Sequence, residues 1–359
     1  MFKLEIAQQF YELITKKDFS RQQMESYFTE NFFLLNKKEK SKFLYALFNG
    51  LMSYDIRPQI IIDMYNILMR LDSYRRDEQP IATKNDNTCI LECTGSGKKP
   101  YKTLNISTPS IITAVASGAN IIKKGSGTTS SILGSADLLY EMGLQDNMSN
   151  DDQLYLLNNT GFSFVDIEKV IPNFNSIYNG FFYRPHILSY ILAADVTSLR
   201  GTKILYGLSC ADIMKCCRCL CYKNTDCEVT VYNSTENKID FFDELIGNGI
   251  AYVARKNVNS QLPTISQYKL NTAPATSLKA MTDRVASIQA VLELLKTRSN
   301  KFYCDVVCYN AGFYLFESGV VNNILDGVEL AKDTLLSGKS YKKLVEIIKC
   351  SGGRPKWNE

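Results

Sequence analysis

The segment that decides the fold reads TGSGKKPYKTLNIST at residues 94–108 and KKGSGTTSSILGSAD at residues 123–137, with one short apolar stretch between them. Each of the two segments combines glycine, hydroxyl side chains and lysine. Glycine lets a ligand approach the backbone closely, serine and threonine donate hydrogen bonds, and lysine supplies positive charge. Two such loops on either side of one helix predict a cradle for a ligand that carries several phosphates.

The residues around these loops predict a strand, a polar loop, a buried helix and a second polar loop. β-Prone residues run over 88–91 and end near Glu92. Thr108 is expected to cap the helix, Pro109 suits its first turn, and Gly118 closes it. The amides at the start of this helix would then point toward the first loop, where an anion is favoured. An ordinary strand–helix unit with flexible loops is the alternative interpretation.

Composition indicates a globular chain with room for one large core and a smaller domain. The 359 residues are 45% hydrophobic and 22% charged, and 41 basic against 37 acidic side chains leave a net charge of +4. That charge is too small to predict nucleic acid or an anionic membrane as a partner. The positive charge is instead local, at Lys98, Lys99, Lys102, Lys123 and Lys124.

Targeting signals are not evident, and we expect a cytoplasmic protein. No segment is apolar over a length that would span a membrane, and residues 1–5 lack the apolar core of a secretion signal.

Cysteine is frequent, with 11 in the chain and six of them between residues 210 and 227. Their spacing does not match the paired ligands of a structural zinc site. A helix over 211–221 would splay the thiols around its surface. Buried free cysteines that behave as small apolar side chains are therefore favoured over a metal site or disulfides.

The pattern of apolar residues divides the chain into a helical first part and a mixed second part. Before residue 80 the three- and four-residue spacing predicts helices over Phe2–Lys16, Arg21–Tyr27, Lys38–Leu51 and Arg57–Arg70. After residue 88 the predicted strands are 121–122, 162–165, 202–206, 228–232, 251–253 and 268–270. The helices predicted among them are 134–142, 211–220, 278–297, 304–318, 320–336 and 341–348. Such alternation predicts an α/β fold with a central sheet flanked by helices.

These motifs resemble those of the anthranilate phosphoribosyltransferase family. Residues 94–97 and 103–108 are similar to that family's GTGGDG and TFNIST, and residues 123–137 are similar to its KHGNRSVSS and GSAD. The C-terminal part agrees as well, with NA, GVELA and SGK at residues 310–311, 327–331 and 337–339. The resemblance covers essentially the whole chain.

The resemblance implies the fold of class IV phosphoribosyltransferases and nucleoside phosphorylase II. A small α-helical domain over residues 1–80, joined by part of 166–195, would stand beside a larger α/β domain over residues 81–359 that binds phosphoribosyl pyrophosphate. The family forms homodimers through the helical domain. Its members transfer a 5-phosphoribosyl group from phosphoribosyl pyrophosphate to an acceptor nitrogen, with Mg²⁺ neutralising the departing pyrophosphate.

The same resemblance implies the residues that bind the donor. They are Thr94, Gly95, Ser96, Gly97, Lys102, Thr103, Asn105, Ser107, Thr108, Lys123, Ser130 and Ser131. Ser107 would also approach the metal. The lysines at 98, 99 and 102, which the family lacks, either strengthen pyrophosphate binding or form a solvated charged turn.

The acceptor motifs depart from the family pattern. Lys124 and Ser126 replace a histidine and an asparagine near the acceptor, and Arg184 falls near the arginine that would hold the acceptor's carboxylate. His186, the only histidine, is assigned with Arg184 as catalytic, because it could orient the acceptor or act as its base. A structural hydrogen-bonding role is the alternative for His186.

The metal motif departs as well. The segment 231–240, taken as the counterpart of the family's GLDE, contains no adjacent acidic pair. Glu236 is the best substitute as a ligand for Mg²⁺, with Asp240 next. A polar turn between a strand and a helix is the alternative interpretation of this segment.

Donor motifs that persist beside altered acceptor motifs predict a phosphoribosyltransferase with a different small amine acceptor, such as an aryl amine or an aminocyclitol, in specialised biosynthesis. A genuine anthranilate phosphoribosyltransferase of tryptophan biosynthesis is the second hypothesis. A nucleoside phosphorylase is the third, and a ligand-binding relative without turnover is the fourth.

Overall fold

The computed structural model describes residues 2–16, 19–82, 88–127, 133–257, 260, 262–278, 283–297 and 300–357. The first part of the chain is built from α1 (Phe2–Ile14), α2 (Arg21–Phe28), η1 (Thr29–Phe33), α3 (Lys37–Leu51), α4 (Pro58–Leu68) and η2 (Met69–Asp72). Local chemistry explains where these helices begin. Ser20 caps α2 and Asn36 caps α3, each in a reciprocal capping box, and Pro58 opens α4.

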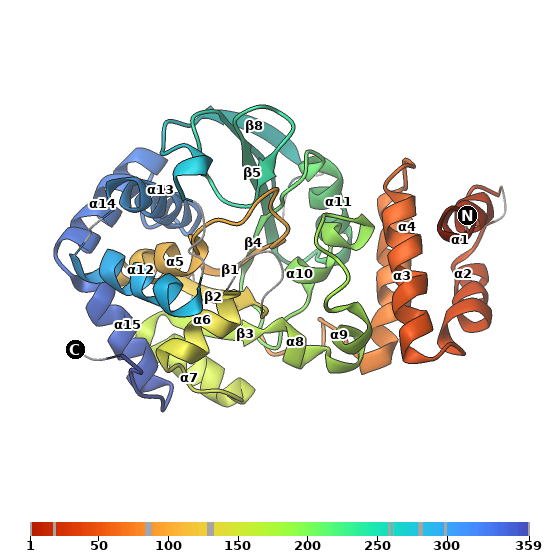
Figure 1. The fold of residues 1–359 in the computed structure, drawn as a ribbon, viewed down its shortest axis with the longest axis horizontal. Helices are drawn as coiled ribbons and strands as arrows, with labels where there is room; N and C mark the ends of the chain where they lie inside the picture. The colour runs from red at the N-terminus through yellow and green to blue at the C-terminus, as the bar shows by residue number, and fades with distance from the viewer. Residues whose placement is uncertain are drawn as a thin grey trace.

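A mixed sheet of eight strands forms the centre of the described part of the molecule (Figure 1). Its strand order is β3-β2-β1-β4-β5-β7-β8, and β6 pairs with β5. The parallel strands are β1 (Ile90–Gly95), β2 (Asn120–Gly125), β3 (Phe162–Asp166), β4 (Lys203–Gly207) and β5 (Glu228–Thr235). The antiparallel additions are β6 (Phe241–Phe242), β7 (Ile250–Lys256) and β8 (Thr264–Lys269).

Helices cover both faces of this sheet, as the pattern of apolar residues predicts. One core contains Leu205 of β4, and a second core contains its neighbours Ile204 and Tyr206, because side chains alternate across a strand. The first core is closed by α5 (Ser107–Ala116), α6 (Ser135–Met142), α7 (Asn150–Thr160), η4 (Ala275–Leu278), α12 (Arg284–Thr297), α13 (Lys301–Glu317), α14 (Ile324–Leu336) and α15 (Lys339–Cys350).

The second core joins the sheet to the N-terminal helices. Between them lie α8 (Ile167–Val170), α9 (Pro172–Tyr178), η3 (Ile187–Tyr190), α10 (Leu192–Asp195) and α11 (Ile213–Lys223). Helix α3 contacts α9 and η3, and α4 contacts α11. In Figure 1 the N-terminal helices therefore lie on one side of the sheet, and α12–α15 lie on the other.

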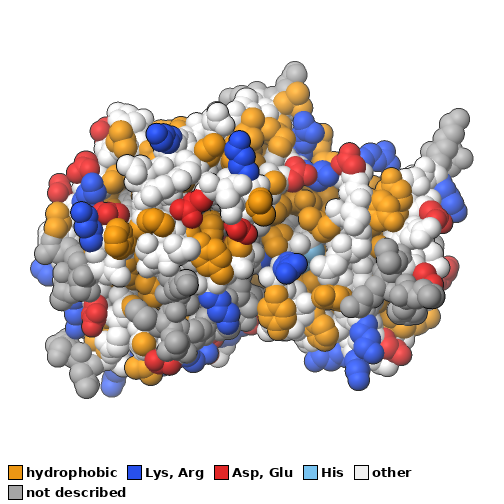
Figure 2. Space-filling view, turned by 45° about the horizontal axis from the view of Figure 1, so that its top comes forward, with side chains coloured by type: hydrophobic (Ala, Val, Ile, Leu, Met, Phe, Trp, Pro, Cys, Tyr) orange, Lys and Arg blue, Asp and Glu red, His pale blue; other side chains and the backbone are white. Residues whose placement is uncertain are grey.

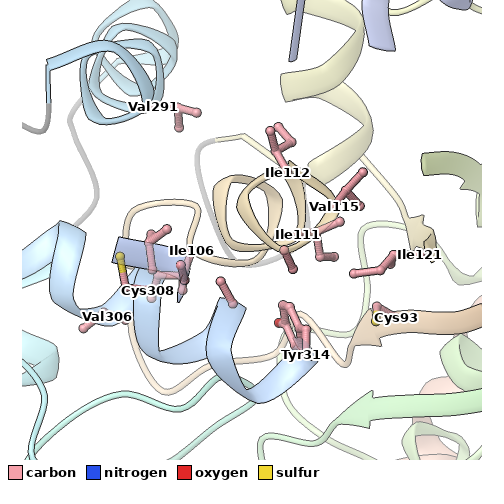
Figure 3. Packing of buried hydrophobic residues seen from close by; sticks show 14 of the residues in the cluster. Cys93, Ile106, Ile111, Ile112, Val115, Ile121, Val291, Val306, Cys308 and Tyr314 are labelled. Atoms are coloured by element: carbon pink, nitrogen blue, oxygen red, sulfur yellow. The ribbon is translucent and has the colours of Figure 1, made fainter. Parts of the chain in front are cut away.

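Helix α5 is the central helix between the two polar loops. Figure 3 shows Ile111 and Val115 on its side toward Cys93 and Ile121 of the sheet, whereas Ile112 lies on the opposite side of the helix. The expected cap at Thr108 is wrong, because α5 begins at Ser107 and Thr108 lies inside it. The remaining predicted helices and strands are found, with their ends shifted by a few residues.

Two further predictions concern the cysteines and the membrane. Cys216, Cys217, Cys219, Cys221 and Cys227 are buried and free, as expected for small apolar side chains. Among the described helices, none combines the length and the hydropathy that a membrane span requires.

Candidate functional site

A cavity of about 160 Å³ opens where the parallel strands β1, β2 and β4 end. Ends of parallel strands meet at one edge of a sheet, where α/β proteins bind their ligands. The cavity is lined from the first loop by Thr94, Gly95, Ser96, Gly97, Lys98, Lys99, Thr103, Asn105 and Ser107. From the second loop it is lined by Lys123, Lys124, Gly125, Ser126 and Gly127. Both predicted loops therefore border one cavity.

The start of α5 is organised by side chains of the first loop. The Asn105 side chain accepts a hydrogen bond from the Thr108 amide at 3.1 Å, and the Tyr303 hydroxyl donates to the Asn105 carbonyl at 2.5 Å. The Ser107 hydroxyl accepts a hydrogen bond from Lys123 Nζ at 3.1 Å, which joins the second loop to the helix start. The amides and hydroxyls of this region are suited to an anion.

Buried lysines make the cavity wall electropositive. Burial lowers the pKa of Lys98 to about 7 and the pKa of Lys123 to about 8. Lys98 Nζ contacts the Tyr178 hydroxyl at 2.5 Å and His186 Nε2 at 3.1 Å, both neutral groups. An ammonium without a carboxylate partner in a dry wall is stabilised by an anionic ligand.

Lys124 pairs with a buried carboxylate instead of facing the cavity with a free charge. Its ammonium lies 2.9 Å from Glu92 Oε2 and also donates to the Ala194 carbonyl, and its side chain is fully buried. Arg76 reaches the same carboxylate, with Nη1 at 2.9 Å from Oε2. The predicted role of Lys124 in binding the acceptor is therefore corrected: it borders the cavity, but its charge is used in a buried ion cluster.

An adjacent acidic pair that the sequence-based assignment missed, Asp243 and Glu244, lines the cavity. Asp243 Oδ2 accepts hydrogen bonds from the Gly97 amide at 2.7 Å and the Ser96 hydroxyl at 3.3 Å. Glu244 Oε1 lies 2.6 Å from Lys99 Nζ. The sequence signal for this pair is the DE dipeptide directly after the short strand β6, which lies just beyond residues 231–240.

The predicted metal ligands Glu236 and Asp240 lie outside the cavity and are corrected. Glu236 is exposed and accepts a hydrogen bond from the Asn248 amide at 3.1 Å. Asp240 accepts one from the Asn237 side chain at 2.9 Å. Both carboxylates belong to the turn between β5 and β6, which matches the alternative interpretation of a polar turn.

His186 and Arg184 also lie outside the cavity wall. His186 is buried behind Tyr178, whose hydroxyl lies 2.7 Å from His186 Nε2, and it stacks on Phe48. Burial and the neighbouring charge of Lys98 lower the pKa of His186 well below its ordinary value, so the ring is neutral. Arg184 is exposed. Their assignment as catalytic residues is corrected in favour of a structural role for His186.

Two predicted donor ligands are displaced from the site as well. Lys102 is exposed and does not border the cavity, whereas Lys98 and Lys99 of the same loop do. Thr108 is fully buried inside α5, away from the cavity wall. Ser130 and Ser131 lie outside the described residues.

Of the residues that line the cavity, Asp243 and Glu244 are the best suited to bind a divalent cation. Within the described residues, Asp243 Oδ1 and Glu244 Oε2 are buried and have no hydrogen-bond partner. A Cβ atom on Gly95 would lie 2.6 Å from Asp243 Oδ2, and a Cβ atom on Gly207 would overlap the Asp243 carbonyl. Asp243 can therefore occupy this position because residues 95 and 207 are both glycine. Carboxylate oxygens are the ligands that Mg²⁺ prefers. Over the described ranges, however, no group of three histidine, cysteine or acidic side chains gathers that could hold a metal by itself.

Comparison with known proteins agrees with this geometry. Residues 87–179 match the glycosyl transferase family, a/b domain. An anthranilate phosphoribosyltransferase of Listeria welshimeri is 29% identical over 277 residues, which cover 75% of this chain and 77% of the relative. The fold is similar to that of anthranilate phosphoribosyltransferase from Thermus thermophilus, with a TM-score of 0.72, 18% identity, and 98% and 100% of the two chains covered.

A third similar protein is the anthranilate phosphoribosyltransferase from Saccharomyces cerevisiae in complex with PRPP and Mg, with a TM-score of 0.69 and 16% identity over 98% of this chain and 91% of that one. The family-model match and the sequence relatives indicate a phosphoribosyltransferase. In sequence and in fold the chain is similar to anthranilate phosphoribosyltransferases, which is the resemblance that its motifs predict.

Proposed function

We propose that this protein transfers the 5-phosphoribosyl group of phosphoribosyl pyrophosphate to the nitrogen of a small amine acceptor. In that reaction the bond from C1 of the ribose to the pyrophosphate oxygen breaks, a bond from C1 to nitrogen forms, and the amine loses a proton. The leaving pyrophosphate develops negative charge, so fixed positive charge and hydrogen-bond donors stabilise the transition state.

One observation carries this proposal: the two polar loops and the start of α5 border a single cavity that also contains Lys98, Lys99 and Lys123. We assign the pyrophosphate and phosphate contacts to Thr94, Gly95, Ser96, Gly97, Thr103, Asn105, Ser107 and Lys123. Asp243 and Glu244, with Ser107, are the residues that would hold Mg²⁺. When bound, Mg²⁺ neutralises charge on the departing pyrophosphate.

Calorimetric titration of the protein with phosphoribosyl pyrophosphate in the presence of Mg²⁺ tests the donor site. We expect saturable binding. Absence of heat at millimolar ligand would contradict the proposal.

The identity of the acceptor is the second part of the proposal. Glu168, Asn175, Tyr178 and Asn179 line the side of the cavity formed by α8 and α9 and its C-terminal end, whereas Arg184 lies on the surface. A carboxylate at this side disfavours an anionic acceptor. We therefore propose an uncharged or cationic amine, such as an aryl amine or an aminocyclitol, and keep Ser126 as a contact.

A genuine anthranilate enzyme is the competing function, which the names of the relatives favour. Incubation with phosphoribosyl pyrophosphate and either anthranilate or a panel of amines, followed by mass spectrometry, separates the two. A phosphoribosylated amine without an anthranilate product supports our proposal. An anthranilate product, together with rescue of a tryptophan-requiring bacterial strain, supports the competing function.

A division into a helical domain over 1–80 with part of 166–195 and an α/β domain over 81–359, and a homodimer formed through the helical domain, belong to the same proposal. Light scattering after size-exclusion chromatography should give the mass of a dimer. A monomer mass at all concentrations would exclude the dimer.

A further inference from the structure

Lys99 lies on the cavity wall with its ammonium turned toward the acidic pair. Its side chain is 11% exposed, and Nζ lies 2.6 Å from Glu244 Oε1 and 3.0 Å from Thr103 Oγ1. The ammonium of Lys99 therefore contacts both a carboxylate of the acidic pair and a hydroxyl of the first loop. On the face of the molecule drawn in Figure 2, lysine and arginine side chains are scattered among acidic ones.

The acidic pair is not satisfied by Lys99 alone. Two carboxylates face one ammonium, and in the described structure Asp243 Oδ1 and Glu244 Oε2 are buried without a hydrogen-bond partner. The site can therefore take one further cation while Lys99 remains beside it.

The other lysines of the cavity are paired with groups outside the acidic pair. Lys124 is bound to Glu92, Lys98 to Tyr178 and Lys123 to Ser107. Of the ion pairs found in the described ranges, Lys99 with Glu244 is the one that joins a lysine of the first loop to the acidic pair. A lysine has a flexible four-carbon stem, so its ammonium can exchange between a carboxylate and an arriving phosphate oxygen.

We propose that Lys99 is a built-in cation of the diphosphate subsite, so that this protein retains diphosphate binding without a divalent metal. This inference rests on the proposed function. Lys99 lines the cavity beside the acidic pair, and its ammonium supplies there part of the charge that a metal ion alone would otherwise bring. A metal bound to the free oxygens of the pair adds to this charge and is not its only source.

Calorimetry with inorganic pyrophosphate tests the proposal on wild type, Lys99→Gln and the control Lys42→Gln, which removes a charge from an exposed position on α3. Each protein is titrated once with Mg²⁺ and once with EDTA. Wild type and the control should bind in EDTA. In EDTA the pyrophosphate affinity of Lys99→Gln should fall by about 10- to 100-fold, which is the value of a charge-assisted hydrogen bond. In Mg²⁺ the loss of affinity should be clearly smaller.

Lys99→Arg keeps the charge and should retain binding in EDTA, which separates a charge effect from a folding defect. Lys99→Gln should also bind Mn²⁺ more tightly than wild type in an electron paramagnetic resonance titration, because the competing ammonium is gone. Equal loss for Lys99→Gln in Mg²⁺ and EDTA, or weaker Mn²⁺ binding, would contradict the proposal.

The outcome for wild type distinguishes this proposal from the proposed function. If wild type binds pyrophosphate in Mg²⁺ but gives no heat in EDTA, the role of Lys99 is wrong and the proposed function stands. If wild type binds under neither condition, the diphosphate subsite itself is wrong, and both proposals fail.

Discussion

Four lysines reach the end of the sheet, and each is held by a different kind of partner. Lys124 has a carboxylate inside the protein, Lys99 has one at the cavity, and Lys123 and Lys98 have neutral hydroxyl partners. A buried ammonium needs a partner because desolvation is costly. The lysines whose partners are neutral are therefore the ones that most favour an anion in the cavity.

Glu92 links the stability of the protein to pH. Burial would raise its pKa, but the charges of Arg76 and Lys124 lower it to about 2 from an ordinary value of 4.5. As the pH falls, the Glu92 carboxylate is protonated in the unfolded chain before it is protonated in the folded protein. The stabilisation by ionised Glu92 is therefore complete above pH 4.5 and is lost as the pH falls toward 2. We expect Glu92 to contribute about 3 kcal/mol to the loss of unfolding free energy over that range, measured by urea unfolding.

The Glu92→Gln variant should show a flatter dependence of stability on pH, because its amide does not titrate. Glu78→Gln is the control, since Glu78 is exposed and pairs with Arg75 at 3.5 Å on the surface. If the unfolding free energy of Glu92→Gln fell with decreasing pH as steeply as that of wild type, Glu92 would not be the group that links stability to pH.

Residue 95 must be glycine because the Asp243 carboxylate lies where a side chain would begin. Gly95→Ala places a Cβ atom 2.6 Å from Asp243 Oδ2, so the carboxylate must move. We expect divalent-metal affinity to fall by about tenfold, as for other displaced metal ligands, in a titration with Mn²⁺. Thermal unfolding checks that the variant is folded, and wild-type affinity in a folded variant would argue against a metal at Asp243.

At the scale of elements, the helix between the two loops connects the site to the core. The start of α5 is set by Asn105, which lies at the cavity, while its apolar face packs on the sheet. The loops are therefore attached at both ends to buried structure. A ligand at the helix start meets amides whose positions are determined by the core.

Asn105→Ala should lower the free energy of unfolding by about 1 kcal/mol, because the Thr108 amide loses its side-chain acceptor. Chemical denaturation measures the change. Asn159→Ala, which removes an exposed side-chain hydrogen bond to the Tyr155 carbonyl, is the control and should cost less. Equal losses would show that Asn105 does not act as a cap.

The strands and helices were largely predictable because their signals are local. The buried parallel strands read as short apolar runs, and the helices carry caps such as Ser20 and Asn36. The ends were less predictable. Strand β8 begins at Thr264, before the predicted run, because it is an edge strand with exposed polar side chains.

At the scale of the whole molecule, polar contacts tie the N-terminal helices to the sheet. The Tyr65 hydroxyl of α4 donates to Asp195 Oδ2 of α10 at 2.8 Å, and Arg76 bridges the Asp195 carbonyl and Glu92 of β1. These groups are buried, so each missing partner leaves an unsatisfied atom. The relative position of helices and sheet depends on this cluster as well as on the shared apolar core.

Tyr65→Phe should lower the free energy of unfolding by about 1–3 kcal/mol, because Asp195 loses a buried hydrogen bond while the ring still packs. Urea unfolding gives the value. Tyr155→Phe, at a side chain that is 59% exposed, is the control and should have no measurable effect. The same stability in both variants would mean that the Tyr65 hydroxyl does not hold the two parts together.

Sequence alone predicted the two polar loops and most of the strands and helices, because their signals lie in the local chain, but it did not predict α7, α8, α9, α10 or β6. Only the tertiary structure decided which distant residues join them. Asp243 reaches the Gly97 amide across 146 positions because β1, β4 and β5 are neighbours in the sheet, a pairing that no local pattern records. The tertiary structure also places His186, the only histidine of the sequence, behind Tyr178 and off the cavity wall. Asp243 and Glu244 line the cavity instead.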